Sequence, residues 1–284
     1  LAIPLYNEVE RMPLLRRALE RFEKTWTLPY EVVLINDGSE DETAAQLQEQ
    51  YATALTERTD VRYVIVDLET NQGKGNALKK GVETATGDHL LTLDADMAAT
   101  PDTLLEWLPL LEGRTFDDHS ILIGSREHPQ SDVKTDGSKR RLLGGLFNIW
   151  VELFTGSNSR DTQCGFKLYP QKIGKWLFAN MLSKGWAHDV ELLHQAGLYD
   201  IDVVEMPLKW KEVDQSKVNV LPDGIKMGFA TMGLVLTGLL QFFWVSPFRE
   251  MKQGLALSRS KESPLYRFLF AFLAMSLIVA MPML

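Results

Sequence analysis

The segment EVVLINDGSEDET, residues 31–43, decides the fold class of this chain. Its first six residues form an apolar, β-branched run, which predicts a buried strand over 31–36. The next residues predict a tight turn, and Ser39 with Glu42 three positions later matches a capping box that opens a helix. We therefore expect a strand, a sharp turn and a helix in direct succession, the unit from which parallel sheets are built.

The same unit recurs along the first 125 residues. Apolar runs predict further strands at 61–68, 89–93 and 120–124, and helical spacing of apolar residues predicts helices at 13–23, 41–55, 75–85 and 101–111. In the last of these helices, Thr100 followed by Pro101 is expected to place proline at the first helical position. This alternation is typical of an α/β protein with a mostly parallel sheet. Such sheets bind ligands at the carboxyl ends of their strands, so the residues that follow each run are the candidate site.

Composition excludes several classes of protein. With 45% hydrophobic and 24% charged residues over 284 positions, the chain can bury a large core and is not mainly disordered. Its one cysteine excludes a disulfide framework and a CxxC zinc site. The formal net charge is −8 overall and +4 from residue 226 onward, which leaves −12 for residues 1–225. This distribution argues against nucleic-acid binding and predicts an acidic domain whose basic end meets an anionic membrane surface.

The C-terminal end differs in kind from the rest. Residues 227–248 carry no charge, and apolar residues dominate 265–284; a helix needs about 20 apolar residues to cross a bilayer. We expect one domain over 1–222 and a membrane-associated region over 223–284, with an interfacial or spanning helix at 227–248 and a transmembrane helix at 265–284. The alternative is that both are buried helices of a soluble domain. Because the chain starts and stops within apolar runs, we expect a fragment at one or both ends.

Two carboxylates follow the predicted strand at 89–93. Asp94 and Asp96 are two positions apart, so at a strand end their side chains project the same way. Paired oxygen donors suit Mg²⁺ or Mn²⁺, whose coordination substrate phosphates and water usually complete. Such a cation neutralises a diphosphate leaving group. A solvated acidic loop is the alternative in a chain with 38 acidic residues.

Other strand ends offer supporting groups. Asp37 follows the first-quoted run and is placed to accept hydrogen bonds from a base or a ribose, although an ordinary Asx turn is the alternative. Tyr6, after the run at the N-terminus, lines a base pocket or caps a helix. Lys74 stands between two glycines ahead of a helix, where anions bind. The spacing is not that of a P-loop, and no GxGxxG occurs, so neither an NTPase nor a dinucleotide dehydrogenase is indicated.

Seven motifs, taken in order, resemble the inverting glycosyltransferases of family 2 with the GT-A fold. They are LYNE (5–8), INDGSEDET (35–43), NQGKGNAL (71–78), LDADMAATP (93–101), GSR (124–126), DTQCGFKLY (161–169) and DVELL (189–193). Within that family they are most similar to the branch that makes polyprenyl-phosphate sugars, above all the dolichyl-phosphate β-glucosyltransferases. Ala98 stands where the mannosyl branch has a metal-binding Gln, which favours UDP-glucose over GDP-mannose. The QxxRW motif of processive polysaccharide synthases is absent from the sequence.

The resemblance also implies roles for single residues. It implies that the donor is bound by the LYNE turn, the turn at Asp37, Lys74 and the acidic pair. Asp37 and Glu8 would hold the uridine, beside Pro4 and Tyr6. Asp94 would bind the ribose and the metal, and Asp96 would bind the metal.

For the acceptor phosphate the candidates are Arg126 and the cluster Lys139–Arg141, with Arg140 at its centre; a solvated or membrane-facing basic patch is the alternative for the cluster. Asp161 and Asp189 rank equally as catalytic carboxylates, and Gln163 borders the same groove. Trp186 either stacks on the sugar or packs under its loop. Cys164 is expected to be a packed loop cysteine.

The resulting expectation is a GT-A hexosyltransferase that moves glucose from UDP-glucose to a polyprenyl phosphate at the cytosolic face of a bacterial inner membrane or the endoplasmic reticulum. Its donor is a UDP-sugar and its cofactor Mg²⁺ or Mn²⁺. The alternatives are a mannosyl- or other hexosyltransferase of the same class and a non-catalytic sugar-nucleotide-binding regulator of a membrane partner.

Overall fold

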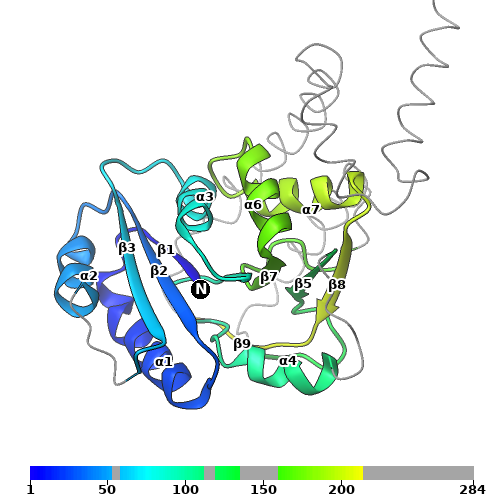
Figure 1. The fold of residues 1–284 in the computed structure, drawn as a ribbon, viewed down its shortest axis with the longest axis horizontal. Coiled ribbons are helices and arrows are strands. Elements are labelled where there is room, and N and C mark those ends of the chain that lie inside the picture. The colour runs from blue at the N-terminus through cyan, green and yellow to red at the C-terminus, as the bar shows by residue number, and fades with distance from the viewer. Residues whose placement is uncertain (53–57, 112–118, 135–158, 214–284) are drawn as a thin grey trace, which may run out of the picture.

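The structure is a computed structural model that describes residues 1–52, 58–111, 119–134 and 159–213. Within these residues, seven strands form the main sheet in the order β3-β2-β1-β4-β7-β5-β8 (Figure 1). The strands are β1 (Ala2–Leu5), β2 (Tyr30–Asp37), β3 (Val61–Leu68), β4 (His89–Thr92), β5 (Ser120–Gly124), β7 (Lys167–Pro170) and β8 (Asp202–Met206). β6 (Asp132–Lys134) and β9 (Lys209–Lys211) pair separately as a small parallel sheet.

All neighbouring strand pairs of the main sheet are parallel except those of β7, which runs antiparallel between β4 and β5. The register of β2 on β3 places Asn36 opposite Asp67 and Asp37 opposite Leu68. The polar ends of these strands therefore meet at one edge of the sheet. The predicted α/β class with a mostly parallel sheet is confirmed.

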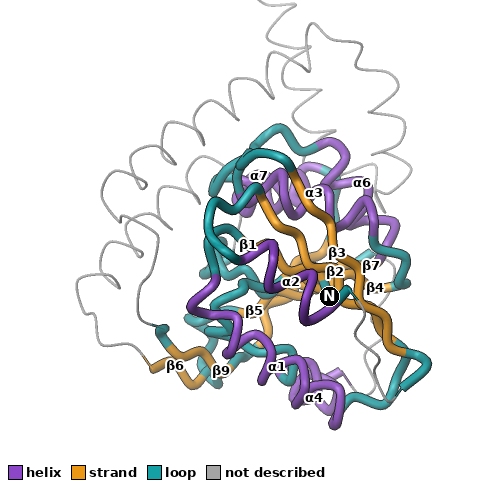
Figure 2. The backbone as a smooth tube through the Cα atoms, turned by 90° about the vertical axis from the view of Figure 1, so that its left-hand side faces the viewer, coloured by secondary structure: helices purple, strands orange, loops and turns teal. Residues whose placement is uncertain are grey.

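Helices cover both faces of the sheet (Figure 2). They are the 3₁₀ turn η1 (Val9–Arg11), α1 (Met12–Thr25), α2 (Thr43–Tyr51), α3 (Lys74–Thr84), α4 (Thr103–Leu111), α6 (Gln171–Asn180) and α7 (His188–Leu198). One apolar core joins the sheet to α1, α2 and α4, and a second joins it to α3, α6 and α7. Each helix buries its apolar stripe on the sheet, as its spacing predicts.

Two predicted helix starts are wrong. α2 begins at Thr43 with no side-chain cap, because the Ser39 hydroxyl accepts a hydrogen bond from the backbone of Asn7 instead, at 2.9 Å. α4 begins at Thr103, so Pro101 lies before the helix rather than at its first position. At Ser39 a contact with a distant segment replaces the expected cap, and Pro101 lies in a turn that precedes the helix.

The expected membrane-associated region lies outside the described residues. This holds for the boundary at 222, the helices at 227–248 and 265–284, and the basic cluster around Arg140. Among the residues that the structure describes, no helix is both long and apolar enough to cross a membrane.

Candidate active site

The acidic pair Asp94 and Asp96 follows β4 at the carboxyl edge of the sheet. The side chain of Asp94 is 41% exposed, and its Oδ1 lies 2.6 Å from the ammonium of Lys74. Asp96 is partly buried and accepts a hydrogen bond from the backbone N–H of Ala98 at 3.0 Å. Burial and the neighbouring Asp94 carboxylate raise the pKa of Asp96 above its ordinary value.

A divalent cation fits this donor set. A hard cation offsets the repulsion between two neighbouring carboxylates, and Mg²⁺ or Mn²⁺ binds through one or two carboxylates when phosphates supply the remaining ligands. In the described part of the chain no cluster of three or more His, Cys, Asp or Glu side chains is placed to hold a metal. The remaining ligands of a cation held by Asp94 and Asp96 would be substrate oxygens and water.

Lys74 lies at the N-terminus of α3 beneath a loop that packs closely on it. A Cβ added at Gly73 would lie 2.7 Å from the carbonyl oxygen of Lys184, and one at Gly75 would lie 2.5 Å from that of Ser183. The two glycines of the NQGKG motif thus allow this loop to lie on the helix. Although burial lowers the pKa of Lys74, the Asp94 and Asp189 carboxylates raise it more, so the ammonium stays charged.

The same loop is held from the other side by α7. Glu191 is buried and accepts backbone hydrogen bonds from Leu182 at 2.8 Å and Ser183 at 2.7 Å. Trp186, 41% exposed, lies with its ring 5.2 Å from the Lys74 ammonium. Two of the sequence motifs, NQGKG and DVELL, therefore meet in one structural unit.

Arg126, directly after β5, forms a bidentate ion pair with Asp161. Its Nε donates to Oδ2 and its Nη2 to Oδ1, both at 2.7 Å, and its backbone N–H donates to Oδ2 at 2.9 Å. Asp161 is 2% exposed, and burial alone would raise its pKa, but the guanidinium lowers it overall. Burial alone would lower the pKa of Arg126, but the Asp161 carboxylate raises it well above its ordinary value, with a smaller contribution from Asp94.

Asp189 opens α7 and pairs with a fully buried lysine. The ammonium of Lys167, on β7, donates to Asp189 Oδ1 and to the carbonyl oxygen of Cys164. Burial alone would raise the pKa of Asp189, but His188, Lys167 and Lys74 hold it well below its ordinary value. Burial lowers the pKa of His188 to about 4, so the imidazole is neutral at pH 7.

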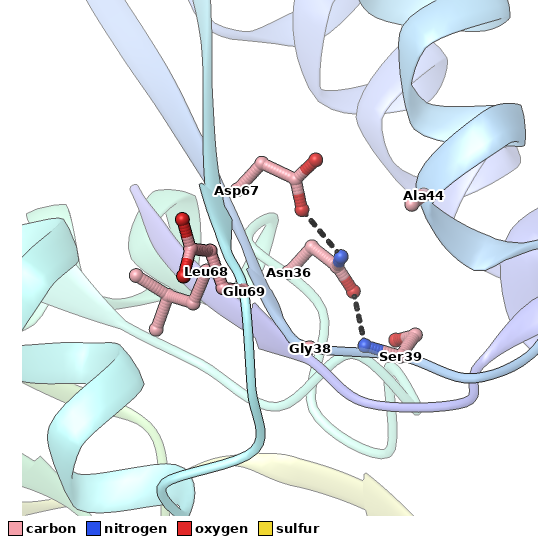
Figure 3. Close-up of a pocket in the computed structure, with 7 residues that line it drawn as sticks. All are labelled: Asn36, Gly38, Ser39, Ala44, Asp67, Leu68 and Glu69. Carbon is pink, nitrogen blue, oxygen red and sulfur yellow. Dashed lines mark hydrogen bonds between the residues drawn. The ribbon is translucent and has the colours of Figure 1, made fainter.

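At the ends of β2 and β3 the structure has a pocket of about 280 Å³ (Figure 3). The amide nitrogen of Asn36 donates to Asp67 at 2.6 Å, and its oxygen accepts from the backbone N–H of Ser39 at 3.2 Å. These bonds orient the amide at the pocket wall. The lining residues are Asn36, Gly38, Ser39, Ala44, Asp67, Leu68 and Glu69.

The candidate uridine ligands lie next to this pocket but outside its lining. Asp37 is buried and accepts the backbone N–H groups of Gln72 at 3.0 Å and Gly73 at 2.8 Å. Glu8 pairs with Arg11 at 3.1 Å.

Three further candidates are half-buried. Pro4 lies on β1, Tyr6 follows that strand, and Gln163 lies between Asp161 and Cys164. Burial raises the pKa of the Cys164 thiol to about 12, which agrees with its expected packing role.

Comparison with known proteins decides the family. The family model described as Glycosyl transferase family 2 matches residues 1–183. This chain belongs to glycosyl transferase family 2. The predicted resemblance is thereby confirmed, and the chain is a hexosyltransferase enzyme.

Two curated relatives of this glycosyltransferase are dolichyl-phosphate beta-glucosyltransferases. The one from Drosophila melanogaster is 34% identical over 235 residues, covering 80% of this chain and 71% of the relative. The one from Homo sapiens is 32% identical over 239 residues, with the same coverage of 80% and 71%.

A solved structure shares the fold. It is glucosyl-3-phosphoglycerate synthase from Mycobacterium tuberculosis in complex with Mn²⁺, UDP and glucosyl-3-phosphoglycerate. It superimposes with a TM-score of 0.57 at 16% identity, covering 83% of this chain and 77% of that one. The comparison supports the GT-A-like architecture of this glycosyltransferase.

Sequence reasoning missed three residues that shape the glycosyltransferase site. Lys167 pairs with Asp189, and Trp210 faces Arg126. Glu205 on β8 accepts the backbone N–H groups of Arg160 at 2.6 Å and Asp161 at 3.3 Å, which holds the segment that carries Asp161. No local pattern marks them, because each acts through a partner at least 22 positions away in the chain.

Proposed function

We propose that this chain transfers glucose from UDP-glucose to a polyprenyl phosphate of the dolichyl type, with inversion at the anomeric carbon. Eight curated relatives that carry the name dolichyl-phosphate beta-glucosyltransferase are 31–34% identical to it, each over 77–80% of this chain. The beta anomer in that name requires inversion when the donor is α-linked, as in UDP-glucose. The alanine at position 98 also favours the glucosyl donor.

The pairing of Asp161 and Asp189 with cations is the observation that favours a phosphate acceptor over an alcohol. Both carboxylates are buried, and each is paired with a cation, Arg126 and Lys167 respectively. A buried carboxylate held ionised by a paired cation is a weak proton acceptor, so it serves an alcohol acceptor poorly. A phosphate monoester has its second pKa near 6, so at pH 7 it is already an anionic nucleophile and needs no base. We assign Asp161 and Asp189 the role of holding their cations in place.

The proposed reaction is a single displacement. A phosphate oxygen of the acceptor forms a bond to the anomeric carbon, and the bond from that carbon to the UDP oxygen breaks, so UDP leaves with the electron pair. Arg126 holds the acceptor phosphate, and Lys74, at the N-terminus of α3, attracts the diphosphate. Mg²⁺ or Mn²⁺ held by Asp94 and Asp96 would neutralise charge on the diphosphate. The Mn²⁺ and UDP in the solved neighbour support this assignment.

We place the donor's nucleobase in the pocket at the ends of β2 and β3. The carboxylates of Asp67 and Glu69 line it and are acceptors for the N3–H of uracil. The other candidates lie close by in the chain: Asp37 ends β2, Pro4 lies on β1, and Tyr6 and Glu8 follow β1.

The acceptor determines where such an enzyme works. Each buried methylene contributes about 0.8 kcal/mol of membrane affinity, so a long prenyl chain stays in the bilayer. We propose that the domain of residues 1–222 works at the cytosolic membrane face and that residues 223–284, with the basic cluster around Arg140, attach it there.

The decisive experiment incubates membranes containing the full chain with labelled UDP-glucose or labelled GDP-mannose, polyprenyl phosphate, and Mg²⁺ or Mn²⁺. We expect labelled lipid from UDP-glucose only, and none after chelation. Labelled lipid from GDP-mannose alone would replace the glucosyl assignment by a mannosyl one. Binding of UDP-glucose without any lipid product would favour the alternative function, a non-catalytic sugar-nucleotide-binding regulator of a membrane partner.

Replacing Arg126 tests the acceptor side separately. We expect Arg126→Ala to raise the KM for polyprenyl phosphate by about tenfold or more, because hydrogen bonds to charged groups contribute about 1.5–3 kcal/mol. The Kd for UDP should stay within about twofold of the original. Arg126→Lys keeps the charge opposite Asp161 and controls for misfolding. A loss of UDP binding would instead assign Arg126 to the donor side.

A further inference from the structure

The guanidinium of Arg126 lies over the indole ring of Trp210, which is on β9. The Cζ of Arg126 lies 5.6 Å from the centroid of the indole, within the range of a cation–π contact. Trp210 is half-buried and packs against the larger apolar core. The guanidinium therefore has the carboxylate of Asp161 along one edge and lies over an aromatic ring.

The backbone segments that carry these two side chains are tied together. The N–H of Ser125 donates to the carbonyl oxygen of Met206 at 2.9 Å. The Ser131 hydroxyl accepts the N–H of Leu208 at 3.0 Å and donates to the carbonyl oxygen of Ser125 at 2.6 Å. These bonds lie near both Arg126 and Trp210 in the chain, so they hold the two backbone segments side by side.

β9 also reaches the loop of the acidic pair. The N–H of Lys211 donates to the carbonyl oxygen of Ala98 at 2.9 Å, and the N–H of Ala98 donates to Asp96 at 3.0 Å. Lys211, the neighbour of Trp210 in the chain, is therefore connected to Asp96 through Ala98. The strand joins the candidate cation ligands to the acceptor-side arginine.

We propose that Trp210 is a positioning residue that sets the tilt of the Arg126 guanidinium relative to the Asp94–Asp96 loop. The inference rests on the proposed function. The bidentate carboxylate of Asp161 fixes the guanidinium within its plane but leaves the plane free to tilt about the axis of the pair. The Trp210 ring against the guanidinium restricts that tilt. It also directs an incoming phosphate to the edge that Asp161 does not occupy.

The test compares Trp210→Ala with Trp210→Phe in the full chain in membranes. We expect Trp210→Ala to raise the KM for polyprenyl phosphate by about five- to tenfold, the ratio to which a partly desolvated cation–π contact corresponds. The KM for UDP-glucose should change by less than about twofold. Trp210→Phe keeps an aromatic face and should restore the acceptor KM to within about threefold of the original.

Two further variants separate positioning from other roles. Lys209→Ala changes an exposed neighbour on β9, whose partner is Glu106, and should leave both KM values unchanged. In Arg126→Ala/Trp210→Ala the acceptor KM should equal that of Arg126→Ala alone, because a residue that acts through Arg126 has nothing left to position.

Each other outcome counts against the inference. A further rise in the double variant would make Trp210 a direct substrate contact, and an equal rise in both KM values would make it a general packing residue. An unchanged acceptor KM in Trp210→Ala would exclude a positioning role. Absence of lipid product from the unaltered chain would overturn the proposed function, and this inference with it.

Discussion

Asp96→Asn is expected to lower turnover by about 10²-fold or more, as loss of an electrostatic contact to a developing charge does. The amide has nearly the same size as the carboxylate and keeps an oxygen for the N–H of Ala98, so the loop should retain its shape. What it loses is the negative charge beside Asp94. The Mn²⁺ concentration needed for half-maximal activity should therefore rise as kcat falls, and a titration of initial rate against Mn²⁺ measures both.

Asp88→Asn is the matched control. Asp88 is exposed and immediately precedes β4, so it lies at the opposite end of the strand that carries the acidic pair. Its replacement should leave kcat and the metal requirement unchanged. Near-normal turnover of Asp96→Asn, or full activity of the unaltered chain after exhaustive chelation, would remove the ligand role of the acidic pair.

Lys167→Met is expected to reduce the free energy of unfolding by about 3–5 kcal/mol, the cost of leaving one partner of a buried ion pair alone. Lys167 is fully buried, and its ammonium donates to Asp189, which is 5% exposed. Methionine fills a similar volume, so lost charge rather than lost packing dominates. Urea unfolding of the full chain measures the change, and Lys209→Met, in an exposed pair with Glu106, should leave it nearly unchanged.

The pH dependence of that loss has a definite sign. In the unaltered chain the pKa of Asp189 is depressed on folding, so the pair's stabilisation is present above about pH 4 and declines as the pH falls toward the lower folded value. Without Lys167, desolvation dominates and raises the pKa of Asp189, although His188 and Lys74 still face it. The loss of unfolding free energy in Lys167→Met should therefore become smaller as the pH falls from about 7 to about 4, because Asp189 can then be buried as the neutral acid.

The double variant Lys167→Met/Asp189→Asn separates a structural role of Asp189 from a chemical one. Removing both charges should recover most of the lost stability. If Asp189 acts only by holding cations, turnover should recover as well. If stability recovers in the double variant but turnover stays low, Asp189 has a catalytic role as well as a structural one. A Lys167→Met variant as stable as the unaltered chain would contradict the buried-pair account.

The local elements were predictable because their signals are local. The apolar runs at 61–68 and 120–124 match β3 and β5, and the predicted helix at 75–85 differs from α3 by one residue at each end. Each such signal is a periodicity that the neighbouring residues themselves carry. Where a cap depended on a distant contact, as at Ser39, the prediction was wrong.

The sequence alone determined the α/β class, the place of Asp94 and Asp96 after a strand, and the family. These follow from ordered motifs and from the periodic spacing of apolar residues, which are properties of the order of residues. The tertiary structure alone decided which charges neutralise which. Lys167 in the tetrapeptide KLYP has no local mark of burial; it is interior because β7 runs antiparallel between β4 and β5. Arg126 likewise meets Asp161 and Trp210, which lie 35 and 84 positions further along the chain. Electrostatic pairing depends on distance in space and on burial, and neither is a property of the order of residues.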